Sequence, residues 1–392
     1  MEALKKCVRI ALLLSTLGVG RIAEAYPDFV AFGYSSCIVC HYNSAGGGPL
    51  TDYGRALWAS EIAARPFWTK KTDEQLGESA GFWGRIDAGP DWLKPYAKYR
   101  GLQYISNLGS SNSQQRWINM QADLGATILL DANAKWILSG AIGFVPVPSG
   151  ASPSRPEESR TLISREYYVR SQISSSSWIY LGLLDKPFGL RIADHTSFSR
   201  RLTETAQNDQ AHGLMWYRKS EGSDLFLNVF AGNLEQKAEL QKAGGTLAYE
   251  ASVSERWKLG GAAGYAANKF VSKSQAAITS RLQVNPRDSL MLETGFVYTS
   301  PVTGGDATKS AYGLVRGMMQ LARGYHFLSQ AEAQRDGIDV GGPTNLRWGL
   351  GFLMFPFQRV ELQTQYSIGR SVRREGGSED AQSLLFQVHL SL

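Results

Sequence analysis

TNLRWGLGFLM, residues 344–354, is a stretch that decides the fold. Its large apolar side chains stand at every second position, with Leu346, Trp348 and Phe352 in one alternating row. Successive side chains of a β-strand point to opposite faces, so this row would form one apolar face of a strand. Segments of this length and alternation are typical of outer-membrane β-barrels, whose outer face contacts lipid.

The same alternation recurs from about residue 96 to the end of the chain. The last segment, for example, aligns Leu384, Phe386 and Val388 on one face. The sequence predicts strands at 97–107, 115–130, 134–145, 160–173, 177–185, 210–218, 224–233, 244–254, 257–268, 274–284, 289–299, 309–321, 325–335, 344–355, 359–370 and 381–392. This even number of strands predicts a transmembrane barrel of sixteen antiparallel strands over residues 96–392.

The connections between the predicted strands also favour a barrel, because short turns alternate with longer loops along the chain. The exception is 269–273, which is too short for a typical external loop. A soluble β-sandwich or propeller is the alternative, but such folds rarely place tryptophan, leucine, phenylalanine and valine on every outward face. The chain ends in Leu392, where barrels of this kind often end in an aromatic residue.

The composition agrees with a large β-structure. The 392 residues include 41 glycines, 10 tryptophans, 17 tyrosines and 16 phenylalanines, and 19% of the residues are charged. The formal net charge of +6 is mild and evenly spread, which argues against nucleic acid as a partner. No stretch after residue 25 is long and apolar enough to predict a transmembrane helix.

Residues 1–25 have the pattern of a secretory signal peptide. A basic start and an apolar run at 10–19 lead to an A-x-A cleavage site at 23–25. The apolar run is shorter than the roughly 20 residues that a membrane-spanning helix needs. Cleavage near Ala25-Tyr26 would remove Cys7 and leave a mature chain for the outer membrane of a Gram-negative bacterium.

Cys37-Ile-Val-Cys40-His41 spells C-x-x-C-H, the attachment pattern of a c-type haem. Two thiols at this spacing form thioethers with the porphyrin vinyl groups, and the adjacent histidine is the proximal ligand of the iron. A zinc site would need two more nitrogen or sulfur ligands, and the mature chain has no third cysteine. A redox dithiol would need a thioredoxin-like βαβ pattern, which the sequence lacks. The sequence therefore predicts one covalent haem c on Cys37, Cys40 and His41.

The motif falls in a short α-helical cytochrome segment, residues 26–70, which a linker at 71–95 joins to the barrel. Residues 51–64 (TDYGRALWASEIAA) predict an amphipathic helix that has Thr51 or Asp52 as its N-cap and covers one haem face. A segment this small cannot enclose a porphyrin alone.

A sixth ligand of the haem iron would have to come from the barrel, because residues 42–85 contain neither methionine nor histidine. His326 and His389 alternate with outward apolar residues and should face the lumen near the periplasmic end. His195 lies in the longest predicted loop, 186–209, and is favoured because a loop can move to meet the iron. All three are candidate ligands, although a lumen histidine is more often an ordinary polar wall residue.

The 186–209 loop also carries Arg191, Arg200, Arg201 and Asp194. These charged residues would line a constriction of the pore or contact the haem, and the alternative is a solvated loop.

The chain resembles the fused outer-membrane cytochrome-porins of iron-oxidising bacteria. The likeness rests on Pro27 and Phe29 before the haem motif, on Pro49-Leu50-Thr51 and Tyr53-Gly54-Arg55 after it, and on the predicted barrel. Motif similarity is confined to the segment around the haem motif, and over the barrel the likeness is architectural. The insertion Ala45-Gly-Gly-Gly48 departs from the pattern and bears on the identity of the electron donor.

The resemblance implies a haem in or beside the barrel that carries electrons inward, from an extracellular donor such as Fe(II) to a periplasmic c-type cytochrome. Physical reasoning agrees, because an apolar band about 25 Å tall blocks electron passage and a haem inside the barrel would divide that span. Two alternatives stay open: a diffusion porin with a structural or sensory haem plug, and outward transfer to an extracellular acceptor. Whether Fe(II) oxidation here is an enzymatic activity also stays open.

Overall fold

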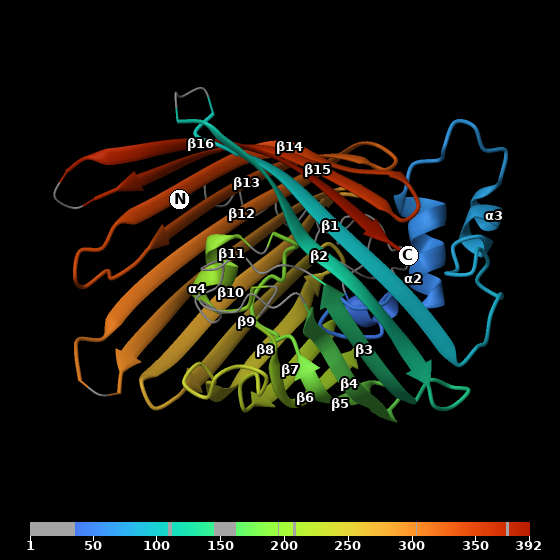
Figure 1. The fold of residues 1–392 in the computed structure, drawn as a ribbon, viewed down its shortest axis with the longest axis horizontal. Helices are drawn as coiled ribbons and strands as arrows, with labels where there is room; N and C mark the ends of the chain where they lie inside the picture. Colours follow the sequence, from blue (N-terminus) through green and yellow to red (C-terminus); the bar gives the residue numbers. More distant parts are fainter. Residues whose placement is uncertain are drawn as a thin grey trace, which may run out of the picture.

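The computed structural model describes residues 36–108, 112–144, 162–194, 196–206, 209–302, 304–373 and 376–392. Over these residues sixteen antiparallel strands form one closed β-barrel, in which β1 pairs with both β2 and β16 (Figure 1). The predicted barrel is confirmed. The predicted signal peptide lies outside the described residues.

All sixteen predicted strands are present, with small shifts at their ends. They are β1 (Leu93–Ser106), β2 (Gln114–Leu129), β3 (Trp136–Phe144), β4 (Leu162–Ser174), β5 (Ser177–Leu184), β6 (Ala211–Ser220), β7 (Ser223–Phe230), β8 (Ala243–Ser254), β9 (Trp257–Ala267), β10 (Val271–Asn285), β11 (Asp288–Pro301), β12 (Thr308–Ala322), β13 (Tyr325–Arg335), β14 (Thr344–Phe357), β15 (Val360–Val372) and β16 (Ser378–Ser391).

The two faces of the strands differ in character, as the alternation predicts. In β3 the side chains of Trp136, Leu138 and Ile142 are exposed on the outer surface, whereas Ile137 and Ser139 between them are buried. An apolar outer face is what a barrel surrounded by lipid requires. The buried inner wall carries charged residues from many strands, among them Arg165, Arg170, Arg281, Arg316, Glu293, Glu332 and Glu361.

The two ends of the barrel carry different connections. One end, called here the short-turn end, has tight turns such as 175–176, 221–222 and 286–287. The opposite end, called the long-loop end, has the longer connections, including residues 185–210 between β5 and β6. The β9–β10 connection at the long-loop end is short, as the sequence indicates.

Residues 51–81 form a cap at the short-turn end. The cap contains α2 (Asp52–Leu57), continued by the π-helix η4 (Trp58–Ile62), and then α3 (Asp73–Glu78), which lie together at one end of the barrel in Figure 1. Thr51 is the N-cap of α2, because its side chain accepts a hydrogen bond from the Gly54 amide at 3.1 Å. The residues predicted as a linker, 71–95, include α3 and the first residues of β1.

The cap is held to the barrel by apolar packing and by hydrogen bonds from two arginines, Arg323 and Arg359, the second of which donates to the backbone oxygens of Ala80 and Gly81. Leu57 and Ile62 are buried in an apolar cluster with Phe355 of β14. Arg323, in the turn between β12 and β13, donates hydrogen bonds to the backbone oxygens of Ala63 (2.8 Å) and Ala59 (3.3 Å). None of the helices in the described ranges has the length and apolar character needed to cross a membrane.

Candidate functional site inside the barrel

Residues 36–50, called here the plug segment, lie inside the barrel. The Ser36 hydroxyl is 2.8 Å from the Tyr217 hydroxyl of β6, and the Ser44 amide donates to the Tyr180 hydroxyl of β5 at 3.2 Å. Arg170 of β4 donates to the backbone oxygen of Tyr42 at 3.1 Å. These contacts join the plug segment to three neighbouring strands, so the C-x-x-C-H motif is placed within the lumen.

The C-x-x-C-H motif forms a compact turn. A 3-10 helix, η3 (Cys37–Val39), is followed by a hydrogen bond of 2.9 Å from the His41 amide to the Cys37 backbone oxygen. The Thr51 amide donates to the Cys40 backbone oxygen at 2.8 Å, which joins the motif to the start of α2. Both cysteines are free thiols.

Glycines allow the motif to pack tightly against its surroundings. A Cβ added at Gly54 would lie 2.4 Å from the Cys40 backbone oxygen, so α2 approaches the motif more closely than a larger residue permits. Gly46, Gly47 and Gly48 follow the motif with φ of +83°, +77° and +60°, a left-handed run that favours glycine. The insertion found in the sequence therefore forms the bend that returns the chain toward the cap.

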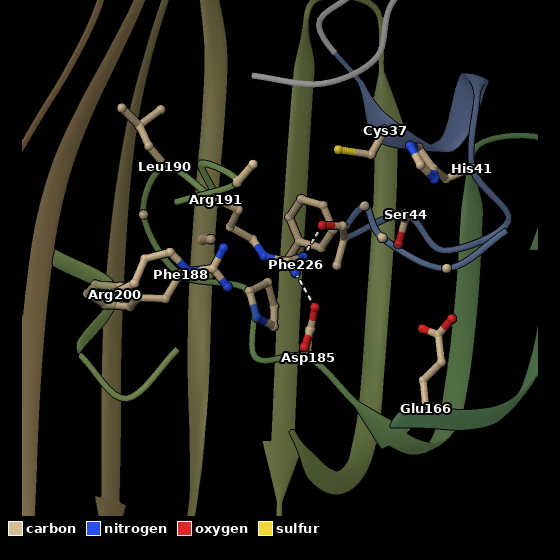
Figure 2. A pocket seen from close by; sticks show the side chains of 18 of the residues that line it. Cys37, His41, Ser44, Glu166, Asp185, Phe188, Leu190, Arg191, Arg200 and Phe226 are labelled. Atoms are coloured by element: carbon tan, nitrogen blue, oxygen red, sulfur yellow. Dashed lines mark hydrogen bonds and ion pairs between the residues drawn. The ribbon is translucent and has the colours of Figure 1, made fainter. Parts of the chain in front are cut away.

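A cavity of about 300 Å³ lies between the plug segment and the inner wall. Its lining includes Cys37 and His41 from the plug segment, Arg191 from the 185–210 connection and Glu166 from β4 (Figure 2). Figure 2 shows Cys37 and His41 on one side of the cavity and Arg191 on another. The volume lies at the lower end of the roughly 300–1,000 Å³ usual for small-molecule and cofactor sites.

Charged residues of both signs surround the cavity. Arg165 pairs with Asp123 at 3.0 Å, and Lys258 pairs with Asp224 at 3.3 Å. Lys98 donates to the Gly48 backbone oxygen. Buried charges of this kind are stable only when paired or hydrogen-bonded, and together they fix the polar inner wall around the motif.

The donor set of the motif fits a c-type haem. Two free thiols and an imidazole are present at the required spacing, and the His41 Nδ1 is buried without a hydrogen-bond partner. Burial, and then the charge of Lys98, lower the pKa of His41 to about 3, so its imidazole is unprotonated and can bind a metal at neutral pH. Cys37 lines the cavity, whereas Cys40 is buried in the apolar cluster with Leu57. The surroundings of the motif thus provide both polar and apolar neighbours for an apolar macrocycle.

The structure separates the histidines that the sequence offers as candidate sixth ligands. His389 lines the same cavity as His41. His326 is fully buried on the inner wall, where its ring lies edge-on to Phe355 with 5.9 Å between centroids, and it does not line this cavity. His195 lies outside the described residues. His326 and His389 both face inward, as their alternation predicts.

The 185–210 connection folds into the lumen. Its Leu190 amide donates to Glu293 of β11 at 2.8 Å, and its Phe198 amide donates to Glu332 of β13 at 3.1 Å. The connection includes the short helix α4 (Phe198–Leu202). Arg347 of β14 holds Asp194 of the connection at 3.2 Å. Of the two interpretations of this loop, the constriction agrees with these contacts.

No sequence motif indicates that two inner-wall residues lie beside His389. Arg100 of β1 and Glu361 of β15 stand directly opposite His389 of β16 on either side. Only the strand register brings them together, because Arg100 and His389 are 289 positions apart in the chain. Alternation with outward apolar residues predicts that each of them lies on the inner wall. It does not predict that they stand next to His389 in one row across the strands.

Comparison with solved structures identifies the barrel as that of outer-membrane porins. The outer-membrane protein OmpT of Vibrio cholerae aligns with a TM-score of 0.58 at 9% identity, covering 78% of this chain and 99% of that one. The outer-membrane channel DcaP of Acinetobacter baumannii aligns with a TM-score of 0.55 at 11% identity, covering 76% and 97%. An anion-selective porin from Comamonas acidovorans aligns with a TM-score of 0.54 at 10% identity, covering 76% and 99%.

Sequence identities this low establish a shared fold but no shared function. No protein-family model and no curated protein matches the chain by sequence. The chain therefore has the closed sixteen-strand barrel of outer-membrane porins, with the C-x-x-C-H segment inside it.

Proposed function

We propose that the protein is an outer-membrane electron-transfer protein, in which a haem c held inside the barrel relays single electrons across the membrane. One observation carries the proposal: the Cys37-x-x-Cys40-His41 turn lies within the closed barrel and borders a cavity. A haem motif on a domain outside the barrel would serve a cytochrome equally well. Inside the lumen, the proposed haem would lie where lipid otherwise blocks the passage of an electron.

The residues of the plug segment have distinct roles in this proposal. Cys37 and Cys40 hold the haem through thioethers, formed when each S–H adds across a vinyl group, and His41 is the proximal ligand. When bound, the haem supplies one-electron chemistry through the Fe(III)/Fe(II) couple. The barrel wall separates the plug segment from lipid, and Arg170 and Lys98 hold the segment through the backbone oxygens of Tyr42 and Gly48.

The direction proposed is inward, from an extracellular donor such as Fe(II) to a periplasmic c-type cytochrome. The cap and both ends of the barrel chain lie at the short-turn end, which is the periplasmic end in barrels of this type. The exposed apolar residues of the outer face support the outer membrane as the site of action, and residues 1–25 would act as the export signal. Outward transfer would use the same arrangement with the opposite potential difference.

A diffusion porin with a structural or sensory haem plug is the second candidate. The comparisons favour it over the relay, because two of the three solved structures named above are described as a channel and an anion-selective porin. Against free diffusion stand the plug segment and the 185–210 connection, which both occupy the lumen.

The deciding experiment uses the full-length protein purified in detergent. Covalent haem is measured by pyridine haemochrome and by haem staining after denaturing electrophoresis, and Fe(II) is then added anaerobically at fixed pH. The relay predicts one haem per chain that Fe(II) reduces, together with low solute conductance in a planar bilayer. The variant Cys37→Ala/Cys40→Ala should lose the covalent stain, whereas the outward-facing variant Trp136→Phe should keep it.

Two results would contradict the proposal. Absence of covalent haem in the wild-type protein, after expression with a haem-attachment system, would remove the relay altogether. A haem that stays oxidised with Fe(II) while the wild-type barrel conducts solutes freely would favour the porin with a haem plug.

A further inference from the structure

His389 stands in the middle of a row of three side chains on the inner wall. In the strand register, Arg100 of β1 and Glu361 of β15 are its direct neighbours on either side. The His389 Nδ1 lies 3.1 Å from Glu361 Oε2, and an Arg100 guanidinium nitrogen lies 3.5 Å from the same ring nitrogen. Because the Glu361 contact is the shorter of the two and a carboxylate can only accept, it favours the tautomer with the proton on Nδ1 and orients the ring.

The other ring nitrogen of His389 has no partner. Nε2 is buried and makes no hydrogen bond, while the residue as a whole is 9% exposed. A buried polar atom without a partner typically costs about 1–3 kcal/mol, so such an atom on a cavity wall points to a group that occupies the cavity. With its proton on Nδ1, the free Nε2 offers a lone pair, which a metal ion accepts.

His389 also shares its cavity with the proximal residue. Both His41 and His389 line it, and His389 does so from the barrel wall. Among the other described histidines, His326 does not line this cavity, and His212 places its two ring nitrogens within hydrogen-bond distance of the Tyr167 hydroxyl and the Leu234 amide. Within the described part of the chain, His389 is thus the histidine that shares a cavity with His41.

We propose that His389 is the sixth ligand of the haem iron, bound through Nε2 and held by Glu361 through Nδ1. This inference rests on the proposed haem at Cys37, Cys40 and His41. A carboxylate behind a ligating histidine sets the tautomer, orients the ring and raises the basicity of the ligand. The bond is dative and releases no leaving group. It would tie the haem to β16 as well as to the plug segment.

The test is optical and electron paramagnetic resonance spectroscopy of the full-length protein in detergent. The wild-type ferric haem should be six-coordinate and low-spin, and the ferrous haem should not bind carbon monoxide readily. His389→Ala should give a high-spin ferric haem and a ferrous haem that binds carbon monoxide, with covalent haem content unchanged. Added imidazole should restore the low-spin spectrum of that variant.

Two further variants separate ligation from a structural role. Glu361→Gln should stay low-spin but shift the haem reduction potential upward, because the histidine donates less electron density to the iron. His326→Ala is the matched control, since it also removes an inner-wall histidine, and its spectrum should equal that of the wild type. His389→Gln, which is closer in volume, repeats the test should the alanine variant fail to fold.

The outcomes distinguish this inference from the proposed function. A low-spin spectrum retained by both His389 variants, or loss of the low-spin state in His195→Ala instead, overturns His389 as the ligand and leaves the haem relay standing. A five-coordinate wild-type haem likewise overturns His389 as the ligand and leaves the haem relay standing. A wild-type protein without covalent haem overturns both.

Discussion

Arg191 of the 185–210 connection donates a hydrogen bond to the backbone oxygen of Ala45 in the plug segment. The two segments that enter the barrel, one from before β1 and one from between β5 and β6, therefore contact each other inside it. The same guanidinium pairs with Asp185 at the start of the connection, as the dashed line in Figure 2 shows. Two segments thus occupy the lumen, and the contact between them stabilises both.

Arg191→Ala should weaken the contact between the 185–210 connection and the plug segment, and so raise the bilayer conductance of the purified barrel. The reason is loss of a charge-assisted hydrogen bond, typically worth about 1.5–3 kcal/mol when it is buried. Asp185→Asn is the matched control, because it removes the ion pair but leaves the Arg191 contact with Ala45. Equal conductance for Arg191→Ala and the wild type would show that the contact with Ala45 does not hold the two segments in place.

Gly54→Ala should displace the cap from the haem motif. The added Cβ would lie 2.4 Å from the Cys40 backbone oxygen and 2.9 Å from its Cα, so backbone must shift, at a typical cost of about 1–3 kcal/mol. The expected result is faster proteolysis of the cap and lower covalent haem content. In the control Gly77→Ala of α3 the nearest atom is 3.6 Å away, and that variant should match the wild type.

Arg323→Ala should loosen the cap around Ala59 and Ala63 while leaving the barrel closed. Arg323 satisfies the backbone oxygens of Ala59 and Ala63 and also pairs with Asp73 at 2.8 Å. Limited proteolysis should cut the variant within residues 51–81, and the barrel should keep its heat-modifiable migration on gels. Asp73→Asn removes only two partly exposed ion pairs, with Arg323 and Arg65, each worth about 0–1 kcal/mol, and should have little effect. Proteolysis of Arg323→Ala at the wild-type rate would contradict this role.

The carboxylate of Glu204, in the 185–210 connection, should stabilise the fold down to strongly acidic pH. Burial alone would raise its pKa, but Lys273, Lys242 and Lys186 outweigh burial and lower the pKa to about 2. Because the folded pKa lies below the ordinary value of 4.5, this stabilisation is complete above about pH 4.5 and is lost as the pH falls toward 2.

The comparison with Glu204→Gln tests this expectation. The difference in thermal midpoint between wild type and variant should be constant from pH 7 to about pH 5 and shrink below pH 4.5. If the difference in thermal midpoint instead disappears between pH 7 and pH 5, the three lysines do not lower the pKa of Glu204.

The local pattern of the sequence was enough to predict the barrel and the helix start. Alternation in segments such as 344–354 depends only on strand geometry and lipid contact, so all sixteen strands were predicted. Thr51 was one of two N-cap candidates, with Asp52, that the sequence offered, because an N-cap acts within a few residues, and the structure selects Thr51. The covalent haem predicted from Cys37, Cys40 and His41 stays a prediction.

The interior could not be predicted in the same way, because it depends on contacts between distant residues. Ser36 meets Tyr217 across 181 positions, and no local pattern encodes that contact. The sequence favoured His195 over His326 and His389 as the sixth ligand, and only the register places His389 between Arg100 and Glu361. A shift of one residue in either pairing would have sent it to the opposite face.

The pairing of β1 with β16 also has a consequence for the order of biogenesis. This pairing joins the first and last strands, so the cylinder closes only when the whole chain has been delivered. In the closed barrel Cys40 is buried and Cys37 is partly buried against the inner wall, which leaves little room for an enzyme that attaches a porphyrin. Under the proposed function, we therefore expect the haem to be attached in a periplasmic precursor, and the barrel to close around a segment that already carries it.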